Sequence, residues 1–177
     1  MYDKGLISEK KFGVHVKFNN HTEASEDYEP TTIRFGDYDK TAFDETHEIM
    51  YMNTVSSDSW ELPVQSINFH GDDLIGKPTK ALINPGMPFI AAPLEEFDLF
   101  KENLKAAHPD ANLVCTRYDW CYFIGQCSDL EQVVDPLTFV FGDSQSNTTF
   151  SIPSSSFMIP DVDYRTNLTL CHLGIVG

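Results

Sequence analysis

A short-range alternation of apolar and polar residues recurs along this chain and limits the folds that it can adopt. Apolar residues alternate with polar ones over positions 14–18 and again over 137–141. This period of two is that of a strand with one buried face. The 13 Phe, 7 Tyr, 10 Gly and 10 Pro residues also fit many strands joined by tight turns. The sequence therefore predicts an all-β fold with mainly antiparallel sheets.

One segment has the spacing of a helix instead. Its apolar residues recur at three- and four-residue steps, which places them on one helical face. Pro93 precedes them, where a proline is tolerated in the first turn, and His108-Pro109 ends the pattern. We expect this apolar stripe to lie in the core. The stripe consists of Leu94, Phe97, Phe100 and Leu104.

Size and charge exclude several classes of function. A domain of 177 residues buries roughly 70% of its unfolded surface and needs no metal to fold. The formal net charge of −15 argues against nucleic acid or an anionic membrane surface as a partner. Such acidity favours solubility and is also common in proteins of acidic compartments. The sequence has no run of eighteen apolar residues, so we expect no membrane insertion.

A compact motif, Asn84-Pro85-Gly86-Met87, lies between the apolar pair Leu82-Ile83 and the predicted helix. Asn, Pro and Gly are the commonest turn formers. By itself, the motif indicates an ordinary turn between a strand and the next element.

The longer segment Leu82–Pro93 resembles the active-site segment of pepsin-like aspartic proteases. In that family two apolar residues precede Asp-Thr/Ser-Gly-Thr/Ser, and further apolar residues and a proline follow. The apolar frame, Gly86 and Pro93 match, and Asn84 stands at the aspartate position. Further segments match the carboxy-terminal lobe of the family in the same order. They are Gly5–Val14, Ile33–Asp39, Met50–Val55 and Trp60–Ile67, which resemble two strands, Pro136–Phe141, and Ile152-Pro153 with Phe157–Ile159, which resemble a pair of strands.

This resemblance implies a single lobe of the double-psi barrel acid protease fold over residues 1–177, with one or two short helices. The amino-terminal lobe of relatives, with its own Asp-Thr-Gly, has no counterpart here. Relatives also continue beyond the equivalent of Leu173–Gly177 with an apolar-apolar-Gly element and a strand pair. The lobe is therefore expected to be incomplete at its C-terminal end. Its exposed strand edges need cover from the amino-terminal lobe of the same precursor or from another protein chain.

The substitutions in the motif bear directly on catalysis. Family members activate water with two carboxylates that share a proton. The amide of Asn84 does not titrate near neutral pH, and Pro85 has neither a hydroxyl nor an N–H group. Met87 occupies a further hydroxyl position. We therefore predict a catalytically inactive homologue that serves as a binding or structural module, with peptide among its potential ligands.

The competing prediction is an aspartic-type endopeptidase lobe that contributes half of an active or weakly active cleft. A single aspartate from the amino-terminal lobe would then act as the base, and Asn84 would orient the water. Loss of a general acid or base typically costs 10²–10⁴-fold in rate, so such a protease would be feeble.

The 4 cysteines are even in number and lack the Cys-x-x-Cys spacing of a structural zinc site. Spacing alone leaves three disulfide connectivities open, as well as four reduced thiols in a cytosolic protein. The family resemblance implies a bond between Cys127 and Cys171, which leaves Cys115 to pair with Cys121.

Three triplets have the form of N-glycosylation sites, although such triplets also arise by chance. Together with disulfides they favour the secretory pathway, with an extracellular or vacuolar/lysosomal destination. No signal peptide is evident at Met1, so we expect a longer precursor or a processed fragment. The acceptor residues are Asn20, Asn147 and Asn167.

No cofactor or metal site is expected from the sequence. Asp72-Asp73 and Asp37-Tyr38-Asp39 could supply oxygen ligands for calcium, but acidic pairs at turns are usually solvated. The chain has no glycine-rich phosphate loop and no Gly-x-Ser-x-Gly motif. The histidines show no spacing that would set two ligands on one helical face. They are His15, His21, His47, His70, His108 and His172.

Overall fold

The structure is a computed structural model that describes residues 1–16, 31–41, 49–116, 119–143 and 146–177. It divides into two compact units, Met1–Tyr51 and Met52–Gly177. Each unit is described by itself.

The first unit is built around a two-stranded antiparallel sheet. A 3-10 turn, η1 (Tyr2–Lys4), precedes strands β1 (Phe12–His15) and β2 (Thr32–Phe35). Phe12 lies opposite Phe35 in the register. β2 leads into Gly36, which has a φ of 87° and packs so closely on Ile7 that a Cβ would lie 3.1 Å from the Ile7 Cβ. Glycine is needed there both for the left-handed backbone and for the close contact.

The predicted alternation over 14–18 is only partly confirmed in this unit. The strand ends at His15, and Val16 lies outside it with an exposed side chain. Phe18 lies outside the described residues.

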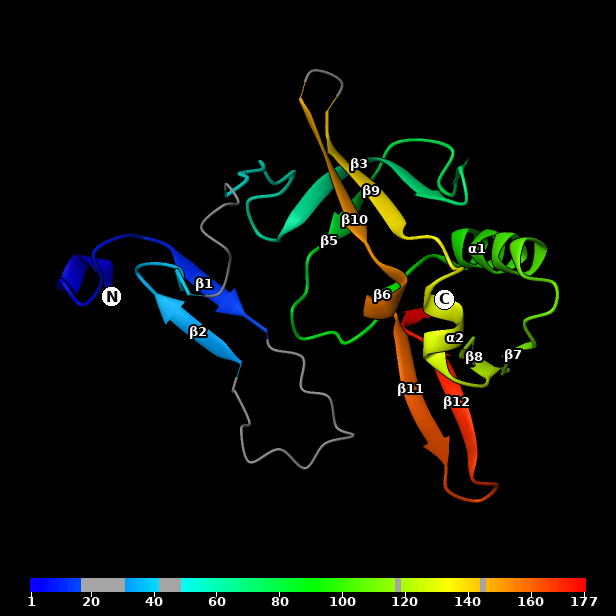
Figure 1. Ribbon diagram of the computed structural model, residues 1–177. Coiled ribbons are helices and arrows are strands. Elements are labelled where there is room, and N and C mark those ends of the chain that lie inside the picture. The colour runs from blue at the N-terminus through cyan, green and yellow to red at the C-terminus, as the bar shows by residue number, and fades with distance from the viewer. Residues whose placement is uncertain (17–30, 42–48, 117–118, 144–145) are drawn as a thin grey trace. The chain divides into compact units, whose positions relative to one another are not determined.

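The second unit contains a five-stranded antiparallel sheet (Figure 1). Its strands pair in the order β10-β9-β3-β4, and β5 also pairs with β3. Leu137, Phe139 and Phe141 of β9 are all buried, as their alternation predicts. The strands are β3 (Glu61–Phe69), β4 (Asp72–Asp73), β5 (Thr79–Leu82), β9 (Leu137–Gly142) and β10 (Asn147–Ile152).

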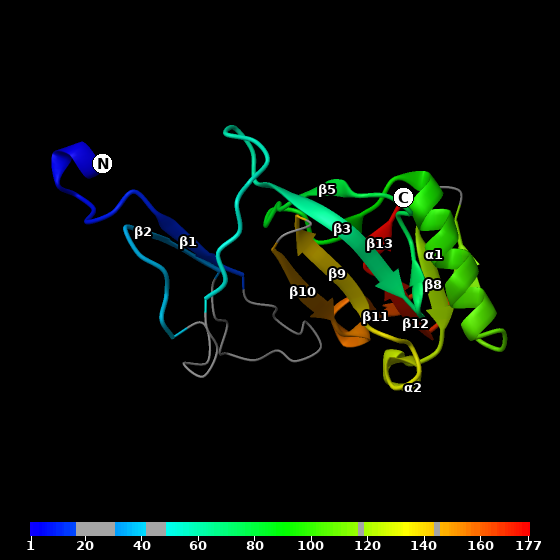
Figure 2. The same ribbon diagram turned by 90° about the horizontal axis from the view of Figure 1, so that it is seen from above.

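A four-stranded antiparallel sheet and a short parallel pair complete this unit (Figures 1 and 2). The four strands follow the order β11-β12-β8-β7, and β6 pairs with β13. Helix α2 (Cys127–Glu131) and the 3-10 turn η2 (Ser154–Ser156) contact each other through a hydrogen bond from Ser154 Oγ to the Glu131 carbonyl, 2.9 Å long. The strands are β6 (Ile90–Ala91), β7 (Leu113–Cys115), β8 (Cys121–Ile124), β11 (Met158–Asp163), β12 (Leu168–Leu173) and β13 (Ile175–Val176).

Helix α1 (Leu94–Ala107) follows the predicted spacing closely. Phe97, Phe100 and Leu104 are buried in the core, and the helix ends before His108. Pro93 is the N-cap residue rather than part of the first turn. The prediction is wrong for Leu94, the first residue of the helix, which is 57% exposed, whereas Phe97 in the same turn is fully buried.

Two further expectations from the sequence need correction. Met50–Val55 contains no strand, because its residues are almost all exposed and the ladder of β3 begins only at Glu61. The segments at Ile152 and at Met158 do form strands, but they belong to different sheets. Pro153 and η2 separate them and redirect the chain.

The described part of the second unit is thus mainly antiparallel β structure with two short α-helices, as the sequence predicts. Among the described residues, no helix has the length and apolar content needed to cross a membrane.

Candidate functional site

The motif Asn84–Met87 forms an exposed turn between β5 and β6. The Met87 N–H donates to the Asn84 carbonyl at 3.1 Å, which closes the turn. The Gly86 N–H donates to Asn84 Oδ1, also at 3.1 Å. A side-chain oxygen that accepts a hydrogen bond from the backbone two residues ahead is the usual asparagine turn. The Asn84 side chain therefore stabilises its own loop.

This arrangement limits the chemistry that the turn can perform. The N–H groups of Gly86 and Met87 are used within the turn. Pro85 and Pro88 have no N–H group. The Asn84 amide neither takes nor gives a proton near neutral pH. The turn therefore lacks a base, and the backbone N–H groups of these four residues cannot serve a developing negative charge.

The segment after the turn is held by the short parallel pair of β6 and β13. The Ile90 N–H donates to the Gly174 carbonyl at 2.8 Å, and the Ala92 N–H donates to the Val176 carbonyl at 2.9 Å. This contact was not predicted from the sequence. Ile175, Val176 and Gly177 themselves form an apolar-apolar-Gly element, and that pattern was the signal that could have revealed it.

An aromatic contact joins the same segment to the β7–β8 hairpin. The rings of Phe89 and Trp120 meet edge to face, with centroids 4.7 Å apart. Trp120 closes the hairpin loop, since its carbonyl accepts the Thr116 N–H at 2.8 Å. The Cys115–Cys121 disulfide links the two strands beside this loop. The position of Trp120 next to the turn segment thus depends on a covalently closed hairpin.

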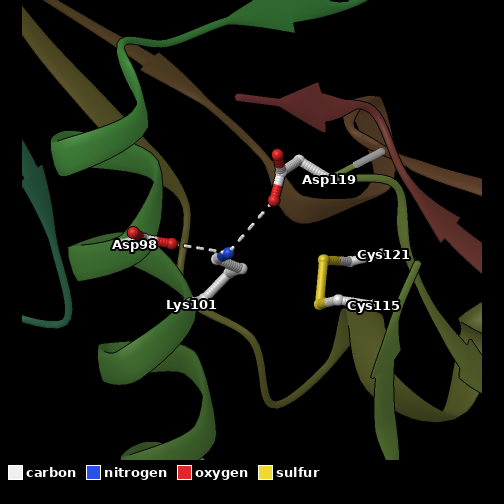
Figure 3. Close-up of a disulfide and its surroundings, with 5 residues drawn as sticks. All are labelled: Asp98, Lys101, Cys115, Asp119 and Cys121. Carbon is white, nitrogen blue, oxygen red and sulfur yellow. Dashed lines mark ion pairs between the residues drawn. A yellow bond between two sulfur atoms is a disulfide. The ribbon is translucent and has the colours of Figure 1, made fainter. Parts of the chain in front are cut away.

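The hairpin is also joined to helix α1 by an ion pair. Lys101 Nζ lies 2.6 Å from Asp98 Oδ1 and 3.6 Å from Asp119 Oδ1, as Figure 3 shows beside the disulfide. Only 15% of the Lys101 side chain is exposed, and its ammonium group also lies 4.5 Å from the centre of the Phe97 ring. These contacts hold the helix and the hairpin together next to the turn.

A carboxylate on the strand beside the turn is already paired. Glu61 lies opposite Leu82 in the β3–β5 register, and its Oε2 is 2.6 Å from Lys80 Nζ. The hydrogen bond from Lys80 lowers the pKa of Glu61. In the family's dyad, a carboxyl shares its proton with a second carboxyl, whereas Glu61 is paired with an ammonium group. The ion pair with Lys80 therefore leaves Glu61 poorly suited to activate a water molecule.

Both disulfides form as the family resemblance implies. Cys127 at the start of α2 is bonded to Cys171 of β12, and Cys115 is bonded to Cys121. Cys127, Cys121 and Cys171 are buried in the core.

The predicted glycosylation acceptors that the structure describes are accessible. Asn147 is exposed at the start of β10, and Asn167 is exposed in the turn between β11 and β12. Asn167 has a φ of 56°, a left-handed conformation that asparagine tolerates. Asn20 lies outside the described residues. Glycosylation at all three stays a prediction.

The acidic pairs lie in turns and strand ends rather than in an ion site. Asp73 Oδ1 accepts the N–H groups of Ile67 and Ile75, each at 3.2 Å, and so links the end of β4 to β3 and to the residues that follow β4. Asp37 accepts the Tyr38 N–H and pairs with Lys11. Within the described ranges no group of three or more His, Cys, Asp or Glu side chains is placed to hold a metal ion.

Comparison with known protein families supports the resemblance. The family model for eukaryotic aspartyl proteases matches residues 1–177. The chain belongs to the eukaryotic aspartyl protease family. A search of curated proteins gave no match. For an aspartyl protease homologue, the two disulfides fit the secretory pathway.

The asparagine turn of this aspartyl protease homologue gives a local prediction. Asn84→Ala should lower the free energy of unfolding by about 1 kcal/mol, because the Gly86 N–H loses its acceptor. Asn84→Asp keeps an acceptor at the same place and should change stability by less. Urea unfolding of the two variants and the parent chain measures this difference. Equal stability of Asn84→Ala and Asn84→Asp would show that the side chain does not stabilise the turn.

Proposed function

We propose that this chain is a catalytically inactive aspartyl protease homologue that binds a polypeptide. The partner is the amino-terminal lobe of the same precursor or another protein chain. The observation that carries this proposal is the engagement of Asn84 in its own turn, by a group that cannot titrate. The cellular location that fits the protein best is extracellular or vacuolar/lysosomal, with glycans on the exposed N-glycosylation sites.

A cluster of exposed apolar side chains around the turn supports binding. We call it the turn surface and define it by five residues. Leu82 and Ile83 enter the turn, Met87 ends it, and the Ile83 N–H donates to the Trp60 carbonyl at 2.9 Å. Trp120 reaches the same loop through Phe89. Each of the five is at least 40% exposed, namely Trp60 41%, Leu82 61%, Ile83 43%, Met87 47% and Trp120 40%.

Such a concentration of apolar and aromatic side chains is typical of protein-binding surfaces. Trp and Met are enriched at interfaces because they bury a large area and adapt to a partner. The turn surface therefore offers apolar contact to a polypeptide in place of the proton transfer that the family performs.

The first test is of catalysis. The purified chain, alone or with an amino-terminal lobe that carries Asp-Thr-Gly, should not cleave denatured protein at acid pH. The reason is that the turn supplies no titrating group. Product formation can be followed by mass spectrometry, with pepsin as the positive control. Turnover that a statine-type inhibitor abolishes would contradict the proposal and favour the alternative, a weakly active protease with a single aspartate.

The second test is of binding by the turn surface. A fluorescein-labelled unfolded protein, such as reduced and carboxymethylated lactalbumin, serves as the probe. Ile83→Glu and Met87→Glu should each weaken its binding at least tenfold, because a desolvated charge costs more than 1.4 kcal/mol. Fluorescence anisotropy measures the dissociation constant.

Val133→Glu is the matched control for this binding test. Val133 is 52% exposed, so its replacement adds the same charge at similar exposure outside the turn surface. Its effect on binding should stay within about twofold. An equal loss in all three variants would mean that charge alone weakens binding, and no loss in any of them would contradict the assigned surface.

A further inference from the structure

A pair of imidazole rings lies at the C-terminal end of helix α1. His70 occupies the turn after β3, and His108 directly follows α1. Their ring centroids are 5.3 Å apart, with an angle of 56° between the ring planes. The two histidines come from elements that are distant in the sequence, so spacing could not reveal the pair.

The outer nitrogen atoms of both rings are buried. His70 Nε2 and His108 Nε2 have almost no solvent contact and no hydrogen-bond partner. Buried polar atoms in folded proteins are nearly always paired with a donor, an acceptor or an ion. The two unpaired nitrogen atoms on neighbouring rings are therefore candidate ligands for a bound ion.

Asp135 determines which nitrogen of His70 is available. The Asp135 carboxylate lies 2.9 Å from His70 Nδ1. With the proton of the neutral ring on Nδ1, the lone pair is on Nε2. A carboxylate behind the non-ligating nitrogen is the arrangement that orients histidine in metal sites.

The distance between the His70 and His108 rings is compatible with one metal ion bound by both. Zinc binds imidazole nitrogen at about 2.0–2.1 Å, and two such rings at a tetrahedral angle have centroids roughly 5 Å apart. Simple ring packing occurs at similar distances, so the separation alone decides nothing. It is the combination with two buried, unpaired Nε2 atoms that distinguishes the pair from an aromatic contact.

We propose that His70 and His108 form a site for a divalent transition-metal ion of the zinc type, bound through both Nε2 atoms. Imidazole suits Zn²⁺, Cu²⁺ and Ni²⁺, whereas Mg²⁺ and Ca²⁺ prefer oxygen ligands. The described residues provide these two nitrogen ligands, and water completes the coordination. A cavity of about 350 Å³ borders His108, with Ala107, Asp110, Leu130 and Val133 among its lining residues.

His172 offers a matched contrast within the same chain. Its Nε2 is also buried and lies 3.3 Å from Asp161 Oδ2, but the ring beside it is Tyr122, with centroids 5.5 Å apart. A histidine next to a carboxylate but without a second imidazole should not hold the ion. Binding at the pair and not at His172 is therefore the specific expectation.

The first experiment uses the unmodified chain. Zn²⁺ is added to isotope-labelled protein while the ring Hε1 signal of each histidine is followed by NMR. The signals of His70 and His108 should change together and saturate at one equivalent, while that of His172 stays in place. EDTA should reverse the change, and Mg²⁺ should not produce it. Independent responses of His70 and His108, or an equal response of His172, would overturn the proposal.

The second experiment measures affinity by calorimetry. His70→Gln and His108→Gln should each weaken Zn²⁺ binding at least tenfold at this site, while His172→Gln should leave it within twofold. Near-ultraviolet circular dichroism checks that each variant is folded. Unchanged Zn²⁺ binding in folded His70→Gln and His108→Gln would also refute the site. If a variant fails to fold, the NMR titration of the unmodified chain still decides the question.

Discussion

Removal of the Cys127–Cys171 disulfide should lower the free energy of unfolding by about 4 kcal/mol. The bond closes a sequence separation of 44 residues, and the loss of loop-closure entropy for a loop of that length gives this value. A loss of this size raises the unfolding equilibrium constant by about three orders of magnitude. The suitable variant is Cys127→Ala with Cys171→Ala, because both sulfur atoms lie in the apolar core.

The second disulfide provides the control for this prediction. Cys115 and Cys121 are separated by only 6 residues, for which the same relation gives about 2 kcal/mol. Urea unfolding of the two double variants, with the parent chain alongside, yields both values. A larger loss for Cys115→Ala with Cys121→Ala would contradict the loop-length argument.

The other large effect concerns the attempt to restore catalysis. Asn84→Asp alone should produce no measurable protease activity, even beside an amino-terminal lobe with its own aspartate. The new carboxylate would take over the hydrogen bond from the Gly86 N–H, which favours its ionised form and lowers its pKa. Pro85 and Met87 would still provide no hydroxyl group to orient it.

The triple variant Asn84→Asp, Pro85→Thr and Met87→Thr restores the local motif of the family. It should exceed the single variant by at least about 10²-fold, since misplacement of a reacting group by about 1 Å costs on the order of 10²-fold. Initial rates at acid pH on a denatured protein substrate measure the difference, and a statine-type inhibitor identifies the mechanism. Robust hydrolysis by Asn84→Asp alone would contradict the expectation that Pro85 and Met87 also prevent catalysis at this turn.

The sequence predicted those elements whose pattern is local. The spacing of Phe97, Phe100 and Leu104 predicts α1, and the alternation in Leu137–Phe141 predicts β9. The disulfide pairing came from the family resemblance, since spacing alone left three connectivities open. The turn at Asn84 could also be predicted from the sequence, because Asn, Pro and Gly favour turns in any context.

Features that depend on long-range contacts were missed or mistaken. Met50–Val55 has apolar residues, but none of the strands in the described part of the chain pairs with it, and it forms no strand. The β6–β13 pair and the contact of His70 with His108 join segments that are distant in the sequence. Single-sequence patterns carry no direct information on such pairings, because they arise only when the sheets are assembled.

The β6–β13 pair also determines when the turn region can reach its final form during synthesis. Ile90 and Ile175 are almost half the chain apart, so the ribosome must add every residue between them before β6 has its partner. Closing so long a loop lowers the conformational entropy of the chain, and only the contacts that form afterwards offset this cost. The segment around Asn84 therefore leaves the ribosome well before the strand that holds β6 in place has been made.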